Sequence, residues 1–305
     1  MTEPRDRLAA AAGSVVTSWQ PAGGDHGARH YRAALADGRE LFVKAAAGGP
    51  GVPALEAEAR GLRWLAEAGD APVAEIVCVA GGLLALGWLP PGRSDRAAAE
   101  RFGRELAGLH GAGPHGAGPR GAGPHGAGLH GAGPARFGAP WPGYIASLPL
   151  PNEEADAWPG WYARFRLLPY VKIAADAGVL SPADVRLIES VADQIGGLAG
   201  PAEPPARIHG DCWTGNVLWS GGRGWLIDPA AHGGHRESDL AMLALFGAPH
   251  LDRVLAAYDE TAPLAAGWQA RVPLHQLHPL LVHVCLFGGG YREAALSAAR
   301  AALSA

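Results

Sequence analysis

The sequence predicts an α+β fold with two lobes, a small β-rich N-lobe followed by a larger, mostly helical C-lobe. Apart from one helical stretch, residues 29–86 consist of short apolar runs separated by glycine turns, which is typical of antiparallel strands. From residue 95 onward, apolar residues recur at helical spacing. At 305 residues, the chain can bury the core that such an architecture needs.

The charge balance and the cysteines limit the classes of partner. A net charge of −4 gives no basic field for a nucleic acid, so we exclude that partner. The longest uncharged run, residues 76–91, is too short to span a bilayer, and the N-terminus does not resemble a signal peptide. Three widely spaced cysteines form no disulfide framework and no metal pattern, which favours a reducing compartment. We therefore expect a cytoplasmic protein without a membrane partner; the oligomeric state stays open.

A glycine-rich hairpin is predicted near the N-terminus. Runs at residues 29–35 and 40–45 are predicted to be strands joined at Asp37-Gly38. Glycines at positions 23–27, among them Gly24, could form a turn whose backbone approaches phosphates. Lys44 ends the second run. Without further support, the segment is equally typical of a plain hairpin with a solvated lysine.

The next segment, residues 53–68, supplies a partner for that lysine. Its periodicity predicts a helix whose buried face carries Leu55, Ala59, Leu62 and Ala66. At 100° per residue, Glu58 lies at the flank of that face, whereas Glu56 points away. We therefore predict an ion pair between Glu58 and Lys44; the alternative is an exposed helix glutamate.

A change of composition predicts the boundary between the lobes. An apolar hairpin over residues 76–86 leads into Gly-Trp-Leu-Pro-Pro-Gly at residues 87–92, a sequence typical of a hinge. Beyond it, the spacing of Phe102, Leu106 and Leu109 predicts a helix. We place the N-lobe at residues 1–89 and the C-lobe at residues 90–305.

Residues 110–134 are five tandem pentapeptides of the type HGAGP. Glycine and proline at this density rule out a stable helix or strand, so we predict a flexible surface insertion in an otherwise intact domain. Four histidines at five-residue spacing leave metal binding as an alternative. Arg120 interrupts the series, and the spacing implies no fixed geometry.

Residues 209–228, HGDCWTGNVLWSGGRGWLID, carry groups in an order that phosphoryl transfer uses. Asp211 comes first and can face an attacking hydroxyl. Asn216 and Asp228 follow and can hold a metal ion. Oxygen ligands of this kind suit a hard cation such as Mg²⁺, with nucleotide phosphates completing its shell.

A hairpin would bring the two metal-binding candidates together. The apolar runs 217–220 and 225–227 flank GGRG, which predicts a four-residue turn. In that register Ser220 pairs with Trp225 and Val217 pairs with Asp228. Asn216 would then lie beside Asp228 at the open end, about 5 Å away at the backbone.

The run HGDCWTGN, followed by LIDPAAHGGHRESDLAMLALFG, resembles the fructosamine (ketosamine) kinase family, a relative of the aminoglycoside and choline kinases with a protein-kinase-like fold. The resemblance implies ATP and Mg²⁺ as cofactors and Asp211 as the catalytic residue. It also implies nucleotide-binding roles, which fall on Lys44, Glu58, Gly24, Trp88, Leu89, Asn216 and Asp228. The backbone amides near Trp88 and Leu89 would face adenine, and Asn216 and Asp228 would hold the metal.

The resemblance also implies a substrate and supporting residues. The acceptor would be the 3-hydroxyl of a ketosamine, either free or on a glycated protein lysine, so the reaction would serve deglycation. Trp213 could stack on the acceptor or simply pack in its loop. His209 and Asp239 would brace the catalytic loop. Cys212 and Thr214 depart from the family pattern without touching a predicted ligand.

Two other functions remain open from the sequence. An aminoglycoside, choline or other amino-alcohol kinase would need an acidic acceptor site, and Glu153, Glu154 and Asp156 form one acidic cluster. A non-catalytic binding module with the same fold is the second alternative. Such a module would be expected to lose Lys44 or Asp211, and both are present.

Overall fold

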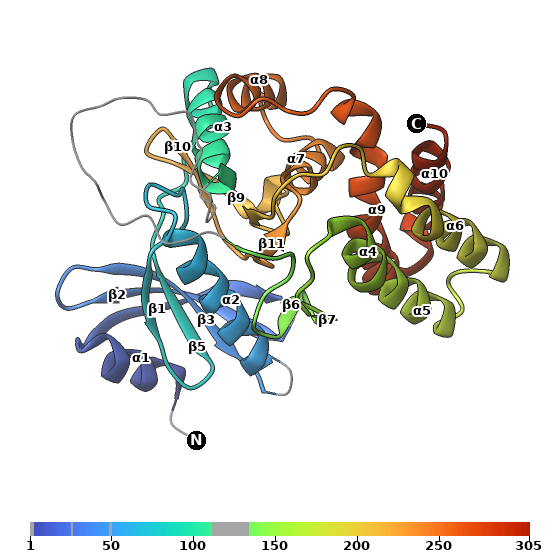
Figure 1. Cartoon of the computed structure of the whole chain (residues 1–305). Coiled ribbons are helices and arrows are strands. Elements are labelled where there is room, and N and C mark those ends of the chain that lie inside the picture. The colour runs from blue at the N-terminus through green and yellow to red at the C-terminus, as the bar shows by residue number, and fades with distance from the viewer. Residues whose placement is uncertain (1–2, 26, 49–50, 112–133) are drawn as a thin grey trace.

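An antiparallel sheet of five strands forms the N-lobe in the computed structural model, which describes residues 3–25, 27–48, 51–111 and 134–305 (Figure 1). Its strand order is β1-β2-β3-β5-β4. The strands are β1 (Val16–Asp25), β2 (Ala28–Leu35), β3 (Glu40–Ala46), β4 (Ile76–Val79) and β5 (Leu83–Gly87). The predicted strands and the turn at residues 37–38 are confirmed.

Two helices cover opposite faces of this sheet, because side chains alternate along each strand. Helix α1 (Pro4–Ala12), which the sequence did not predict, packs Leu8 against Leu83 and Ala85 of β5. Helix α2 (Gly51–Ala66) packs against Leu84 and Leu86 on the other face. The even-numbered positions of β3 share the α2 face, which directs Lys44 toward that helix.

The predicted buried face of α2 is correct at Leu55, Ala59 and Leu62 but wrong at its last position. Ala66 is exposed, and Leu65 is fully buried instead. Helix phase alone would place Ala66 on the buried face, but Ala66 is the last residue of α2, and the larger Leu65 packs into the apolar cluster instead.

The C-lobe is helical (Figure 1). Its α-helices are α3 (Arg96–Gly111), α4 (Trp158–Tyr162), α5 (Leu168–Asp176), α6 (Pro182–Leu198), α7 (Arg236–Leu245), α8 (Leu251–Thr261), α9 (Trp268–Phe287) and α10 (Arg292–Leu303). Shorter helical turns are η1 (Ala163–Leu167), η2 (Thr214–Asn216) and η3 (Gly288–Tyr291). Helices α4, α5, α6, α9 and α10 enclose the larger apolar core of this lobe.

Three small strand pairs lie in the C-lobe and carry the loops of the site. They are β6 (Gly143–Ile145) with β7 (Leu148–Leu150), β8 (Ala206–Ile208) with β11 (His232–Gly234), and β9 (Val217–Ser220) with β10 (Arg223–Leu226). A second apolar cluster joins the lobes, since it contains Leu62 of α2, Phe102 of α3 and Leu226 of β10. The lobe boundary after residue 89 stays a prediction.

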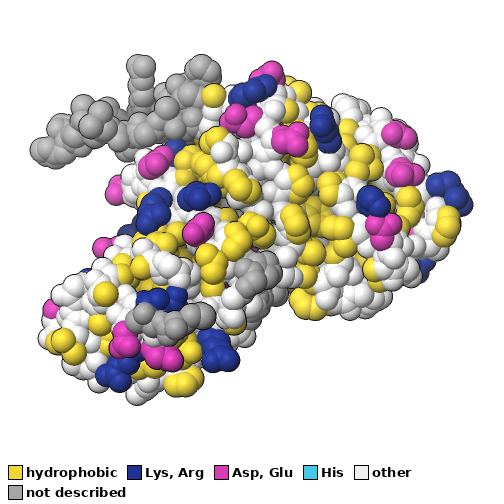
Figure 2. Space-filling view, turned by 90° about the horizontal axis from the view of Figure 1, so that it is seen from below, with side chains coloured by type: hydrophobic (Ala, Val, Ile, Leu, Met, Phe, Trp, Pro, Cys, Tyr) yellow, Lys and Arg dark blue, Asp and Glu magenta, His cyan; other side chains and the backbone are white. Residues whose placement is uncertain are grey.

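The predicted insertion falls mostly on residues 112–133, which lie outside the described residues. His110, which we counted as its first residue, instead lies in the last turns of α3 and is buried. Across the described part of the chain, we find no helix with the length and hydropathy that a bilayer crossing requires. Figure 2 shows acidic and basic side chains interspersed over one face, consistent with the net charge of −4.

Candidate active site

The hairpin β9–β10 has a tighter turn than the sequence suggested. Ser220 pairs with Arg223 and Val217 pairs with Leu226, so the predicted pairing of Val217 with Asp228 is wrong. Gly221 and Gly222 both adopt positive φ, 58° and 71°, which allows a two-residue turn that matches the twist of the strands. Arg223 therefore belongs to the strand and not to the turn.

The corrected register still keeps Asn216 close to Asp228. The Ile227 amide donates to the Asn216 carbonyl at 3.1 Å, which extends the ladder by one pair. The Asn216 side-chain Nδ2 lies 3.5 Å from the Asp228 carbonyl oxygen. The two predicted metal ligands are thus neighbours at the open end of the hairpin.

The loop that carries Asp211 is held by its backbone. The amides of His209 and Gly210 donate to the two carboxylate oxygens of Asp239, at 2.7 and 2.9 Å. His209 Nε2 donates to the Ile227 carbonyl at 2.8 Å, which ties the loop to the hairpin. Gly210 has φ +79°, and a Cβ there would lie 2.3 Å from the Ala230 carbonyl, so only glycine fits. These contacts are the bracing that we expected of His209 and Asp239.

Asn216 fixes the carboxylate of Asp211. Its Nδ2 donates to both the carbonyl oxygen and Oδ2 of Asp211, each at 2.9 Å. Burial raises the pKa of Asp211 to about 7; the hydrogen bond from Asn216 opposes this rise, and the charge of Asp228 adds to it. Asp211 therefore changes its protonation state close to neutral pH.

Lys44 joins the lobes through two carboxylates. Its Nζ lies 3.0 Å from Glu58 Oε2 and 2.5 Å from Asp228 Oδ1, and the lysine is buried. Burial alone would lower the pKa of Lys44, but the two carboxylates outweigh it and hold this pKa above its usual value. Burial raises the pKa of Glu58. The predicted pair of Lys44 with Glu58 is present.

Asp228 adopts a backbone conformation that few residues other than glycine adopt. Its φ of 54° is left-handed, which costs about 1–3 kcal/mol and persists only where the surroundings impose it. The contact of its carboxylate with Lys44 is one such constraint. Strained residues of this kind cluster at functional sites.

These side chains meet around one cavity of about 180 Å³ between the lobes. Lys44 and Glu58 line its N-lobe side, and Asp211, Asn216 and Asp228 line its C-lobe side. A further wall comes from Tyr144, Ile145 and Ala146 at the β6–β7 turn, and Trp213 also lines the cavity.

Three of the predicted nucleotide contacts do not line this cavity: Gly24, Trp88 and Leu89. Gly24 lies in β1 and pairs with Arg29. The Trp88 amide donates to the Glu40 carbonyl at 2.9 Å, so this amide is already used within the sheet. Adenine contacts at Trp88 and Leu89 stay predictions.

The family model for "Fructosamine kinase" matches residues 8–305. The chain belongs to the fructosamine kinase family. A "Probable ketoamine kinase" of Klebsiella aerogenes is 32% identical over 168 residues, which span 55% of this chain and 57% of that relative. The match thus covers little more than half of the curated relative's length.

Solved structures agree with this membership. A crystal structure of a "putative fructosamine-3-kinase" from Thermobifida fusca is 48% identical, covers 99% of both chains and has a TM-score of 0.91. A macrolide 2′-phosphotransferase from Brachybacterium faecium is 17% identical, with 95% of this chain and 96% of that chain covered and a TM-score of 0.59. The second likeness shows the fold alone, and that fold is the protein-kinase-like one that the sequence predicted.

Sequence reasoning missed His110, which supports the site of this family member. His110 Nε2 lies 3.0 Å from Asp239 Oδ2, and its Nδ1 lies 2.8 Å from the Tyr258 hydroxyl. One signal for His110 was available in the sequence: it directly follows Leu109, the last residue of the apolar pattern Phe102, Leu106, Leu109. The repeat obscured this signal, because His110 also begins the first HGAGP unit.

The residues present fit a bound Mg²⁺. No hydrogen bond from the described residues reaches Asn216 Oδ1, since this side chain bonds to Asp211 through Nδ2. Asp228 contacts Lys44 through Oδ1. Amide and carboxylate oxygens are the ligands that Mg²⁺ prefers. Asn216 and Asp228 are therefore suitable metal ligands.

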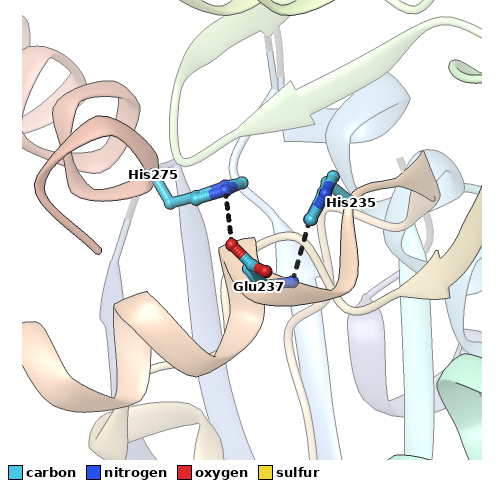
Figure 3. Close-up of side chains that lie close together, drawn as sticks. All are labelled: His235, Glu237 and His275. Atoms are coloured by element: carbon cyan, nitrogen blue, oxygen red, sulfur yellow. Dashed lines mark hydrogen bonds and ion pairs between the residues drawn. The ribbon is translucent and has the colours of Figure 1, made fainter. Parts of the chain in front are cut away.

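A second buried cluster, shown in Figure 3, does not fit a metal as well. His235, Glu237 and His275 offer ligand atoms within 4.8 Å of one another. However, Arg271 donates to both Glu237 oxygens, at 2.9 and 2.6 Å, so a guanidinium already neutralises this carboxylate. Burial raises the pKa of Glu237, but hydrogen bonds from His275 and Arg271 outweigh it and lower that pKa to about 2. We assign the cluster a structural role.

Buried histidines around this cluster predict that the protein loses stability in mild acid. Burial lowers the pKa of His235 and of His278 to about 3. Burial also lowers the pKa of three further imidazoles: His209, His232 and His275. A group whose pKa is lower in the folded than in the unfolded state takes up protons on unfolding, so the stability that these imidazoles contribute is lost as pH falls.

Two carboxyls act in the opposite direction. Burial raises the pKa values of Asp211 and Glu58, so these carboxyls tend to release protons on unfolding. More imidazoles than carboxyls are shifted, so we expect a net uptake of protons on unfolding, and the free energy of unfolding of the free protein should fall as the pH drops from 7.5 to 5.5. Urea unfolding at pH 7.5, 6.5 and 5.5 measures this slope, and a flat profile would contradict it.

Proposed function

We propose that this protein transfers the γ-phosphoryl group of ATP to the 3-hydroxyl of a ketosamine such as a fructosamine or ribulosamine. One observation carries the proposal. In a member of the fructosamine kinase family, Lys44, Asp211, Asn216 and Asp228 converge on a single cavity between the lobes. A glycated protein lysine is an acceptor of the same chemistry, and phosphorylating it would be a step in deglycation.

The proposed chemistry assigns each group a task. The acceptor hydroxyl oxygen attacks the γ-phosphorus, the bond from the γ-phosphorus to the bridging oxygen breaks, and ADP leaves. Asp211 accepts the hydroxyl proton, and Asn216 holds this carboxylate in place. Lys44 steadies the nucleotide phosphates. Magnesium held by Asn216 and Asp228 would neutralise charge on these phosphates. Catalysis then consists mainly of positioning and charge stabilisation.

The acidic cluster that favoured an aminoglycoside or choline kinase is largely neutralised. Asp156 Oδ1 lies 2.7 Å from the guanidinium of Arg136, and Glu153 Oε2 lies 3.6 Å from that of Arg164. These acids are exposed, so they are solvated surface pairs. This observation supports a ketosamine over a polycationic acceptor.

An ATP-consumption assay with the purified protein tests the proposal. The acceptors are ribulosyl-lysine, fructosyl-lysine, choline and an aminoglycoside, each with and without Mg²⁺. We expect the ketosamines to be turned over only when Mg²⁺ is present. The NMR spectrum of the product should show the phosphate on the oxygen of the 3-hydroxyl. Turnover of choline or the aminoglycoside alone would reject the acceptor class. ATP consumption without any dependence on acceptor would reject the kinase proposal.

A further inference from the structure

Five partly exposed aromatic side chains follow one another outward from the cavity. Trp213, which lines the cavity, contacts Phe246 at a ring-centroid distance of 5.6 Å, and Phe246 contacts His283 at 5.0 Å. His283 in turn contacts Phe287 at 5.5 Å and Tyr291 at 4.7 Å. We call these five rings the aromatic surface. It is assembled from the catalytic loop, the end of α7, α9 and η3.

The aromatic surface carries no formal charge at neutral pH. None of its members is an acid, a lysine or an arginine. Burial lowers the pKa of His283, whose Nδ1 donates to the Pro279 carbonyl at 2.8 Å, so its ring is neutral. Neutral ring faces attract apolar groups and single ammonium ions, which rest against the π-system. A polycation would find no carboxylate among these rings.

The outer end of this surface is open to solvent among the described residues. Phe287 is 59% exposed, the largest exposed fraction of any Phe, Tyr or Trp side chain in the described part of the chain. An isolated exposed aromatic residue is common and needs no explanation. Phe287 is not isolated, because ring contacts connect it through His283 and Phe246 to Trp213 beside Asp211. The surface is therefore continuous with the phosphoryl-transfer site.

We propose that the aromatic surface binds an apolar side chain next to the glycated lysine of a peptide acceptor. The inference rests on the proposed ketosamine kinase function and names the acceptor class. The flexible four-carbon stem of a lysine would place its sugar beside Asp211 and its amine over Trp213. The next residue of an extended peptide lies about 3.3–3.6 Å further along the chain, and its side chain would lie against the outer rings, Phe287 and Tyr291.

Steady-state kinetics with matched acceptors test this inference. The acceptors are two ribulosylated peptides, identical except for Phe or Gly beside the modified lysine, and free ribulosyl-lysine. With the wild-type protein, kcat/KM for the Phe peptide should exceed that for the Gly peptide about tenfold, through KM. Phe287→Ala should lower kcat/KM for the Phe peptide about fivefold and leave free ribulosyl-lysine within twofold.

Two further variants make the result specific. Phe287→Tyr keeps the ring and should retain the preference for the Phe peptide. Val15→Ala is the control: it removes an apolar side chain that is 69% exposed and lies next to β1, far from α9 (Figure 1). This variant should leave kcat/KM unchanged for all three acceptors. Equal kcat/KM for both peptides, or equal losses on all acceptors in Phe287→Ala, would overturn the inference while the kinase proposal stands. Absence of turnover with every ketosamine would overturn both.

Discussion

Replacing Asp211 with asparagine should lower kcat by about 10³-fold, because the substrate hydroxyl would lose the carboxylate that we propose as the acceptor of its proton. The substitution preserves shape, and an asparagine carbonyl can still accept the hydrogen bond that Asn216 donates at 2.9 Å. The fold and the KM for ATP should therefore change little. Initial rates over a range of ATP and acceptor concentrations, together with thermal unfolding, measure both quantities.

A matched control separates this loss from a general effect of removing an acid. Asp193 is an exposed aspartate on α6, and Asp193→Asn should keep wild-type rates. The pKa of Asp211 near 7 adds a second signature. The wild-type kcat/KM should fall as pH drops below 7, since protonation removes the base. Undiminished activity in Asp211→Asn would show that another group takes the proton.

The sequence predicted which candidate catalytic groups meet at the cavity, because they lie close together in the chain. Asp211, Asn216 and Asp228 come from one loop and one hairpin, so local geometry alone brings them near one another. The pair of Lys44 and Glu58 was also predictable, since β3 and α2 are consecutive and helix phase selects between two glutamates.

The hairpin register could not be fixed in the same way. GGRG allows either a two-residue or a four-residue turn, and the choice depends on both glycines accepting positive φ. Apolar alternation did not decide it, because the two registers differ by two residues and keep the same faces. The shorter turn also places Arg223 in the strand, where it forms an ion pair with Glu105 of α3.

Residues that reach the site from distant elements gave weaker signals. His110 contacts Asp239, which is 129 residues away in the sequence, and no local pattern specifies that contact. Tyr144 lines the cavity from a short hairpin whose proline and glycine neighbours predict only a loop. The aromatic surface likewise depends on how α7 and α9 pack, which is set by side-chain complementarity over the whole C-lobe.

Replacing Asp239 with asparagine should destabilise the protein by about 3 kcal/mol. Its Oδ2 accepts from the His209 amide at 2.7 Å and lies 3.0 Å from His110 Nε2, while Oδ1 accepts from the Gly210 amide at 2.9 Å. Asparagine has one acceptor oxygen, so its NH₂ group must face at least one of these donors. The site is buried, and water cannot replace the lost bond.

The same substitution should lower kcat in the folded fraction, since the peptide units before Asp211 lose their anchor. Asp259→Asn is the matched control. Asp259 accepts from the Leu264 amide at 2.7 Å, but it is exposed on α8, where solvent can substitute, so its loss should cost less than about 1 kcal/mol. Urea unfolding compares the two variants at pH 7.5. Equal destabilisation would mean that burial does not set the strength of the Asp239 contacts, and unchanged kcat would mean that Asp239 does not position the catalytic loop.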